Sequence, residues 1–253
     1  MNRFETEPRV KAVVVLSGGQ DSAICLALAV KKYGASEVAA ITFAYGQRHS
    51  VETKFARRLA KRFGVVAHKV VKFGFYKDIT TNALLDPKMA IRDGKDARLK
   101  TEDPKGRETG DGRPERTRDA RRETPPNTVV EGRNAFFLMA AAVWAKSLGA
   151  TVLYTGVSQT DYSGYPDCRA AFVKAQQKAI RLALDYPIKV VTPFMKMTKA
   201  DEWALAAKLG IFDVIANETV TCYNGIPGKG CGKCPACKLR NRGLKEFKSN
   251  VGI

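Results

Sequence analysis

An apolar, mostly β-branched run near the start of the chain ends abruptly at a Ser-Gly-Gly turn. The run covers residues 13–16, the sequence S-G-G-Q-D-S occupies residues 17–22, and a helix-like stretch extends to residue 33. Such a run is typical of a buried parallel strand. Adjacent glycines let backbone N–H groups converge on an anion, and the positive end of the helix dipole adds to the attraction. The segment therefore predicts a strand, a phosphate-binding loop and a helix.

The loop differs from two familiar nucleotide-binding motifs, because neither G-x-x-x-x-G-K-[ST] nor G-x-G-x-x-G describes it. Its S-G-G-x-D-S order instead resembles the pyrophosphate loop of enzymes that cleave ATP between the α- and β-phosphates. An ordinary connection between a strand and a helix is the simpler interpretation. The full six-residue pattern after a hydrophobic strand favours the phosphate loop.

Strand-like and helix-like segments alternate along the rest of the chain. Strands are expected at 38–43, 65–73, 152–157 and 188–192, and helices at 50–64, 134–148, 168–184 and 198–209. Thr198 and Asp201 fit a capping box at the start of the last of these helices. The alternation predicts an α/β fold, in which a parallel twisted sheet carries helices on both faces. Ligands of such sheets bind beyond the carboxyl ends of the strands, where residues 17–22 would lie.

One segment interrupts this alternation. Residues 92–123 contain 11 Lys or Arg and 9 Asp or Glu, and their only aliphatic residues are Ala97, Leu99 and Ala120. Because the segment cannot bury an apolar face, we expect a disordered insertion. The chain is thus divided into an α/β domain at 10–215, which carries the insertion, and a C-terminal segment at 216–253.

Four of the six cysteines gather near the C-terminal end with the spacing of metal ligands. They are Cys222, Cys231, Cys234 and Cys237. The two C-x2-C steps bring three thiolates to one point, and the glycine-rich residues 225–232 let the fourth fold back. A closed set of four thiolates is typical of a structural zinc site, with one zinc per chain. An iron–sulfur cluster is the main alternative, although no second set of cysteines completes a ferredoxin motif.

The composition favours a cytoplasmic protein with anionic ligands. No stretch approaches the roughly 20 apolar residues of a membrane span, no secretion signal occurs, and cysteines in metal-ligand spacing fit a reducing compartment. The net charge of +18 favours anionic partners. No aromatic residues are interleaved with the basic clusters, so we interpret this charge as a solvated surface and do not expect a nucleic-acid partner.

Six further motifs follow the loop in the order of one enzyme family. They are Y-G-Q-R-H at 45–49, G-R-N at 132–134, T-G-V at 155–157, T-D-Y-S-G-Y-P-D-C-R at 160–169, T-C-Y-N-G at 221–225 and G-C-G-K-C-P-A-C at 230–237. With the loop, they resemble the 7-cyano-7-deazaguanine synthases, nitrile-forming ligases of queuosine precursor biosynthesis. The resemblance skips only the charged insertion. It implies an adenine nucleotide α-hydrolase-like fold and a homodimer.

The resemblance also implies a reaction, in which 7-carboxy-7-deazaguanine and ammonia form a nitrile through an adenylated acid and an adenylated amide. ATP with Mg²⁺ would be the co-substrate, and Asp21 would orient the metal ion. The catalytic residues it implies are Ser17, Asp21, Ser22 and Arg133. The implied ATP-binding residues are Leu16, Ser17, Gly18, Gly19, Gln20, Asp21, Ser22, Ala23, Ile24, Cys25 and Leu26. The implied substrate-binding residues are Asp161, Tyr162, Asp167 and Arg169, which suit a planar base with ring N–H groups.

Two other functions stay open at this point. A tRNA-thiolating enzyme with the same ATP loop would explain the basic charge, but it needs a reactive cysteine pair. A non-enzymatic, zinc-containing nucleic-acid module would leave the loop unexplained. Cys25 lies inside the first helix and is also expected to be a small core residue.

Overall fold

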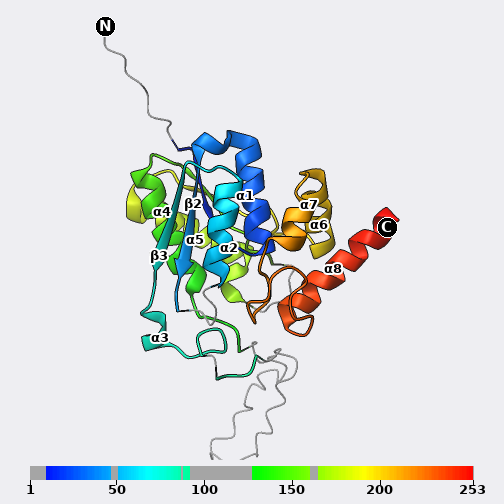
Figure 1. Cartoon of the computed structure of the whole chain (residues 1–253). Helices are drawn as coiled ribbons and strands as arrows, with labels where there is room; N and C mark the ends of the chain where they lie inside the picture. The colour runs from blue at the N-terminus through cyan, green and yellow to red at the C-terminus, as the bar shows by residue number, and fades with distance from the viewer. Residues whose placement is uncertain (1–9, 47–50, 87, 92–126, 160–164, 253) are drawn as a thin grey trace, which may run out of the picture.

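The computed structural model describes residues 10–46, 51–86, 88–91, 127–159 and 165–252. These residues contain one parallel sheet of five strands in the order β3-β2-β1-β4-β5 (Figure 1). The strands are β1 (Ala12–Val15), β2 (Val38–Ala44), β3 (Ala67–Lys72), β4 (Val152–Tyr154) and β5 (Lys189–Val191). The central strand β1 pairs with β2 on one side and with β4 on the other, so that Val13 lies opposite both Ala39 and Leu153.

The strand order reverses direction at β1. From β1 the chain proceeds to β2 and β3 on one side of the sheet, and it then returns to build β4 and β5 on the other side. A crevice forms at the carboxyl ends of the strands at such a switch point, because the connections on its two sides leave in opposite directions. The loop at 17–22 follows β1 directly and therefore lies at this crevice.

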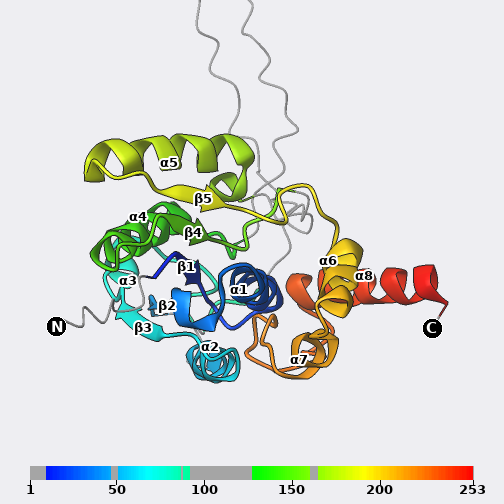
Figure 2. The same cartoon turned by 90° about the horizontal axis from the view of Figure 1, so that it is seen from above.

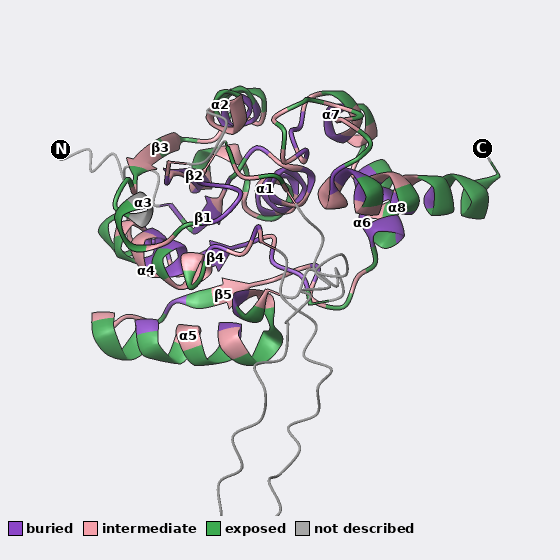
Figure 3. Cartoon of the chain, turned by 90° about the horizontal axis from the view of Figure 1, so that it is seen from below, coloured by how far each residue is buried: buried purple, intermediate pink, exposed green. Residues whose placement is uncertain are grey.

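Helices cover both faces of the sheet, as the alternation predicts. Helices α1 (Gln20–Tyr33) and α2 (Val51–Arg62) lie on one face, and α4 (Arg133–Ser147) and α5 (Ala170–Leu184) lie on the other (Figure 2). The side chains of β1 alternate between two cores, with Ala12 and Val14 in the first and Val13 in the second. The strands β1 and β2 at the centre are almost entirely buried, whereas β3 and β5 at the two edges are partly exposed, as is the outer side of α5 (Figure 3).

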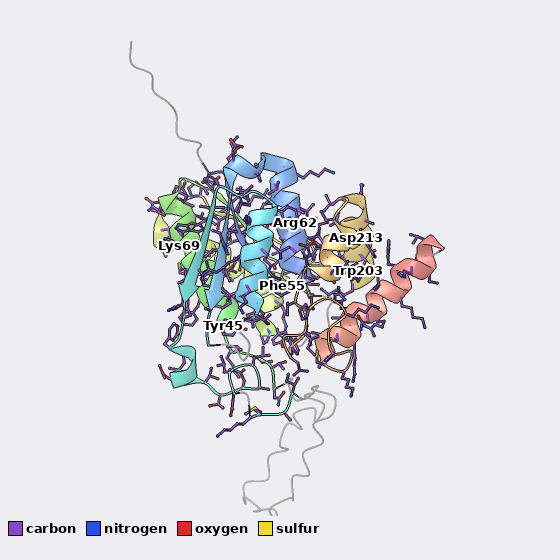
Figure 4. All side chains as sticks on the ribbon, viewed as in Figure 1. Tyr45, Phe55, Arg62, Lys69, Trp203 and Asp213 are labelled. Atoms are coloured by element: carbon purple, nitrogen blue, oxygen red, sulfur yellow. The ribbon has the colours of Figure 1, made fainter. Side chains whose placement is uncertain are left out.

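A group of three helices near the C-terminal end packs beside α1. It consists of α6 (Lys199–Lys208), α7 (Phe212–Asn217) and α8 (Pro235–Val251). The predicted capping box of Thr198 and Asp201 begins α6. Trp203 on α6 is fully buried, and its indole Nε1 donates a hydrogen bond to the Arg240 carbonyl of α8 at 3.3 Å. Figure 4 shows Trp203 between the body of the molecule and α8.

The remaining elements are short. They are the 3-10 helices Ala35–Glu37 and Pro166–Cys168 and the single-turn helix α3 (Tyr76–Ile79). The strand expected at 152–157 ends at residue 154, and the residues after it line the cavity described below. The insertion expected at 92–123 lies outside the described residues. Within the part that the structure describes, no helix is long and apolar enough to cross a membrane.

Candidate active site and metal centre

A cavity of about 300 Å³ opens at the carboxyl ends of β1, β2 and β4. The loop after β1, the first turns of α2, α4 and α6, and the segment that carries the cysteines all contribute to its wall. The polar and glycine residues of this wall include Ser17, Gly19, Gln20, Asp21, Ser22, Tyr45, Glu52, Arg133, Gly156, Tyr165, Lys199, Thr221 and Tyr223. The cavity therefore lies at the switch point of the sheet, where ligands of this architecture bind.

Two serine side chains hold the loop closed on itself. The Ser22 hydroxyl accepts hydrogen bonds from the Ser17 N–H at 3.2 Å and the Ser17 hydroxyl at 3.1 Å, and it donates to the Gly19 carbonyl at 3.0 Å. The Gly19 N–H donates in turn to the Ser17 hydroxyl at 3.3 Å. The side chains of the loop thus hold its backbone in place before any ligand binds. Because less conformational entropy is then lost on binding, an anion would bind at a lower cost in free energy.

Two glycines let neighbouring segments approach the loop closely. Gly18 has a φ of +93°, and a Cβ atom there would lie 2.6 Å from the Glu52 carbonyl oxygen. A Cβ atom at Gly156 would lie 3.0 Å from Asp21 Cβ. A Cβ contact of 2.6 Å does not occur in real structures, so only glycine at residue 18 lets α2 begin against the loop. At residue 156 a larger side chain would force the segment after β4 to shift away from Asp21.

A buried lysine joins the loop to α6. Lys199 Nζ lies 2.9 Å from Asp21 Oδ2, 2.9 Å from Glu202 Oε1 and 3.1 Å from Glu202 Oε2. Glu202 is fully buried and also accepts a hydrogen bond from Gln20 Nε2 at 3.3 Å. Burial raises the pKa of the Glu202 carboxyl well above its usual range, and Asp21 raises it further, whereas Lys199 lowers it.

Asp21 keeps one oxygen that accepts no N–H hydrogen bond from the residues that the structure describes. Its Oδ1 atom is buried and has no hydrogen-bond partner among the described residues, while Oδ2 is taken by Lys199. A buried carboxylate oxygen without a donor costs free energy unless a ligand supplies the missing interaction. Carboxylate oxygen is also the ligand atom that Mg²⁺ prefers. The predicted role of Asp21 as a magnesium ligand is therefore chemically compatible with its surroundings.

Arg133 and Glu52 are the other charged groups of the wall that are considered for catalysis. Arg133 is the first residue of α4, and its Nη1 atom donates to the Tyr45 hydroxyl at 3.0 Å. Tyr45 lies just beyond the end of β2, below Phe55 of α2 in Figure 4. Glu52 lies in the first turn of α2. Burial raises the pKa of Glu52 to about 7, against the opposing effect of the Arg133 charge.

The structure brings together much of the predicted ATP and catalytic set. Leu16, Ser17, Gly19, Gln20, Asp21, Ser22 and Arg133 all line the cavity, whereas Gly18 of the loop packs against α2 and does not line it. The predicted residues 23–26, among them Cys25, have no exposed surface and pack in the core around α1. The expectation that Cys25 is a core residue is confirmed.

The predicted substrate residues are placed differently. Asp167 is buried and accepts a hydrogen bond from the Asn134 N–H at 2.9 Å, and Arg169 is exposed at the start of α5. Neither of these two residues lines the cavity. Asp161 and Tyr162 lie outside the described residues. The substrate roles of all four residues stay predictions.

The prediction of site residues missed Glu52, Lys199 and Thr221. Lys199 and Glu202 are three positions apart at the start of a helix, a spacing that is common in exposed ion pairs. Only the burial of this pair against the loop distinguishes it from a surface pair. Glu52 has no distinguishing signal in its local sequence.

The four predicted cysteines form one cluster. Their Sγ atoms all lie within 4.8 Å of one another, with 3.9 Å between Cys231 and Cys237 and 4.0 Å between Cys222 and Cys234. A tetrahedral zinc site with Zn–S bonds of about 2.3 Å has S–S edges of about 3.8 Å. The cluster could therefore hold a metal ion.

Backbone groups around the cluster favour thiolates. Cys231 Sγ accepts hydrogen bonds from the N–H groups of Lys233 at 3.4 Å and Cys234 at 3.3 Å. Although burial raises the pKa of Cys231, these donors lower it to about 6 overall. Gly230 has a φ of +67°, and a Cβ atom there would collide with Cys237 Sγ. The glycine therefore keeps the space between the sulfur atoms open, as a metal ion requires.

The cysteine segment is also a wall of the cavity. The Val220 N–H donates to the Gly18 carbonyl at 2.9 Å, and the Gln20 N–H donates to Thr221 Oγ1 at 3.3 Å. On the far side, the hydroxyl oxygens of Tyr223 and Tyr165 lie 3.3 Å apart. The residues directly before and after Cys222 thus contact the loop and the opposite wall, so the order of the metal cluster affects the shape of the cavity.

The fold and the cavity define an α/β protein whose ligand site lies at the switch point of a parallel sheet. The model of the family described as "Queuosine biosynthesis protein QueC" matches residues 11–248. The chain is 46% identical over 238 residues to a Bacteroides fragilis protein named 7-cyano-7-deazaguanine synthase, covering 94% of this chain and 96% of that protein. A protein of the same name from Clostridium acetobutylicum is 43% identical, with 94% and 95% covered. The chain therefore belongs to the QueC family.

Two solved structures show a more distant likeness. One is an NMN synthetase from Francisella tularensis, with 13% identity, a TM-score of 0.48, and 96% of this chain and 84% of that chain covered. The other is an NH3-dependent NAD synthetase from Campylobacter jejuni, with 12% identity, a TM-score of 0.43, and 96% and 75% covered.

Proposed function

We propose that the chain converts 7-carboxy-7-deazaguanine and ammonia into 7-cyano-7-deazaguanine, with ATP cleaved to AMP and pyrophosphate. The observation that carries this proposal is the match to the QueC family over residues 11–248, with relatives named for this product at 43–46% identity. The cavity at the switch point supports it, because it combines a loop suited to phosphate with a wall of polar side chains.

The reaction requires two activations of one carbon atom. A carboxylate is a poor electrophile, so it first attacks the α-phosphate of ATP and releases pyrophosphate. Ammonia then displaces AMP and forms an amide. A second ATP adenylates the amide oxygen, and loss of AMP together with the remaining N–H protons gives the nitrile. Because both oxygens of the carboxyl group must leave, two ATP are consumed for each nitrile formed.

Residues of the loop and Arg133 are proposed to bind the charged groups. The N–H groups of the loop and the first turn of α1 would hold the phosphates. Asp21, through its unpartnered Oδ1, would bind Mg²⁺, which offsets phosphate charge when bound. Arg133 carries its charge into the cavity, where it suits a phosphate or the substrate carboxylate.

The deazaguanine ring is proposed to bind near residues 158–169. Ser158, Tyr165 and Cys168 border the cavity, and Asp161 and Tyr162 belong to the same stretch of chain. In this arrangement Asp167 would position Asn134, because the Asp167 carboxylate accepts a hydrogen bond from the Asn134 N–H at the start of α4. Arg169 completes the set carried over from the family resemblance.

We propose zinc as the metal of the four-cysteine cluster, in one copy per chain. Four thiolates leave no open coordination position, so the metal would organise residues 216–253 against the domain at 10–215 and would not activate water. An iron–sulfur cluster is less well supported, since no second cysteine set lies nearby in the sequence. A reactive cysteine pair, as tRNA thiolation requires, has no support in a chain whose C-terminal cysteines form one cluster.

The further parts of the proposal rest on the family resemblance and on cysteine chemistry. We propose that the protein forms a homodimer, that it is located in the cytoplasm, and that its substrates are small molecules. Light scattering of the purified protein tests the oligomeric state.

The experiment that tests the proposed function is product analysis. The purified chain, 7-carboxy-7-deazaguanine, an ammonium salt and MgATP are incubated, and the products are identified by mass and counted against AMP. We expect the nitrile and two AMP for each nitrile. Absence of any product that depends on the carboxylate substrate, or a ratio near one AMP for each nitrile, would contradict the proposal.

A further inference from the structure

Only two carboxylates of the described residues line the cavity, and one of them forms no hydrogen bond or ion pair with that part of the chain. The two are Asp21 and Glu52. Asp21 is held by Lys199 at 2.9 Å. Within the described ranges, the Glu52 carboxylate forms no hydrogen bond and no ion pair, and Arg133 donates from Nη1 to the Tyr45 hydroxyl. Glu52 therefore faces the cavity with its acceptor oxygens available to a ligand.

The backbone fixes Glu52 close to the phosphate loop. The Glu52 carbonyl oxygen lies so near Gly18 that a Cβ atom there would be 2.6 Å away, and Ala56 N of the next turn would lie at 3.0 Å. Phe55 and Ala56 are buried in the core, which anchors this turn of α2. A side chain in such a position is held next to the loop that is proposed to bind phosphate, without using its own polar atoms for support.

The ionisable groups that interact with Glu52 come from two elements. They are Arg133 at the start of α4 and Tyr45 after β2, while Asp21 at the start of α1 lines the same cavity. The Tyr45 hydroxyl is neutral near pH 7, because burial raises its pKa. The balance of burial and the Arg133 charge leaves Glu52 as a carboxyl group that can both accept and release a proton near neutral pH.

The proposed function contains a step that requires such a group. Ammonia is present mainly as ammonium near neutral pH, and ammonium has no lone pair with which to attack. A base in the cavity must therefore take a proton before the C–N bond can form. We propose, on the basis of the proposed function, that Glu52 binds ammonium in the cavity and is the catalytic base that converts it to the attacking amine.

The step balances without any further reactant. One proton passes from the ammonium nitrogen to the Glu52 carboxylate, and the freed lone pair forms the C–N bond with the adenylated carbon. The C–O bond to AMP breaks, and its electron pair leaves with the AMP phosphate. A second proton leaves the nitrogen for solvent as the amide forms. Glu52 then releases its own proton to solvent and is ready for the next cycle.

The test separates the ammonium step from the adenylation that precedes it. Glu52→Gln is isosteric and neutral, and its folding is checked by circular dichroism and thermal unfolding. Exchange of labelled pyrophosphate into ATP, driven by 7-carboxy-7-deazaguanine without ammonium, reports adenylation alone. Hydroxylamine is mostly unprotonated near neutral pH, so it attacks without prior loss of a proton. Its product, a hydroxamate, is counted separately.

We expect Glu52→Gln to keep pyrophosphate exchange and hydroxamate formation within about threefold of the wild-type rates, and to lose about a hundredfold of its ammonium-dependent rate. Glu52→Asp keeps the carboxylate and should recover part of that rate. The matched control is Glu37→Gln, whose carboxylate pairs with Lys11 at 2.9 Å beyond the opposite end of the sheet. It should behave as the wild-type enzyme does.

The outcomes distinguish this inference from the proposed function. An unchanged ammonium-dependent rate in Glu52→Gln would overturn the role of Glu52, as would an equal loss with hydroxylamine or a loss of pyrophosphate exchange. A wild-type chain with no exchange driven by the carboxylate substrate would instead overturn the proposed function itself.

Discussion

Replacement of Lys199 by Met is expected to destabilise the protein strongly. The change removes three ionic contacts of 2.9–3.1 Å, one to Asp21 and two to Glu202, and it keeps a side chain of similar length. The Lys199 side chain is 7% exposed and that of Glu202 is 0% exposed, so solvent screens this pair very little. Removing one partner of a buried pair costs about 3–5 kcal/mol, because the other charge stays buried without compensation.

The expected loss corresponds to a measurable shift in melting temperature. For a protein of this size, 1 kcal/mol shifts the melting temperature by roughly 2–4 °C, so we expect a decrease of about 10 °C at pH 8. Thermal unfolding followed by circular dichroism measures it. Lys178→Met, which alters an exposed lysine of α5, is the control and should melt with the wild type. The double variant Lys199→Met, Glu202→Gln should recover about 1–3 kcal/mol, because the charge left behind is also removed.

The pH dependence of the same variant has a definite sign. The folded protein raises the pKa of Glu202 above its value of 4.5 in a model compound, and loss of Lys199 removes the opposing effect. A carboxyl group with a raised pKa in the folded state destabilises the fold as the pH rises from its unfolded pKa to its folded pKa. Loss of Lys199 raises the folded-state pKa of Glu202 further, so the deficit of Lys199→Met should shrink as the pH is lowered from 8. A deficit below about 1 kcal/mol at pH 8, or one that grows on acidification, would refute this account of the buried pair.

Three further changes test other parts of the structure. Gly230→Ala should lose most of its bound metal by elemental analysis, because the new Cβ atom collides with Cys237 Sγ. Gly232→Ala is the control and should keep its metal, because it has the same backbone strain but no atom within 4 Å of the new Cβ atom. Equal metal content in the two variants would contradict the geometry of the cluster. Gly243→Ala should lower the free energy of unfolding by about 1–3 kcal/mol in denaturant titration, because its Cβ atom would lie 2.8 Å from the Lys199 backbone. Gly74→Ala, where the new Cβ atom meets open space, is the control, and equal stability of the two variants would contradict this prediction. Asp21→Asn should reduce AMP formation by about a hundredfold while the protein stays folded, since it removes the charge proposed to bind Mg²⁺; wild-type turnover in a folded variant would remove that role.

The sequence predicted the general plan of the fold, since that plan depends on local pattern. The apolar run before residue 17, the alternation of strands and helices, and the capping box at Thr198 are periodic or short-range signals. The helix expected at 134–148 is found at Arg133–Ser147, one residue away at each end. Helix α8 was not predicted, because its first turn lies inside the cysteine motif and the rest is a mixture of basic and apolar residues.

The sequence by itself also determined the family, the loop and the four cysteines of the metal cluster, because each of these is a contiguous or closely spaced motif. Only the tertiary structure decided how these parts form one cavity. The contact of Glu52 with Gly18 joins α2 to the loop, and the contact of Lys199 with Asp21 spans the chain from α6 to α1. A carboxylate on the first turn of a helix looks the same in sequence whether solvent or a cavity surrounds it. Its surroundings, and therefore its chemistry, are decided by packing between segments that are distant in the chain.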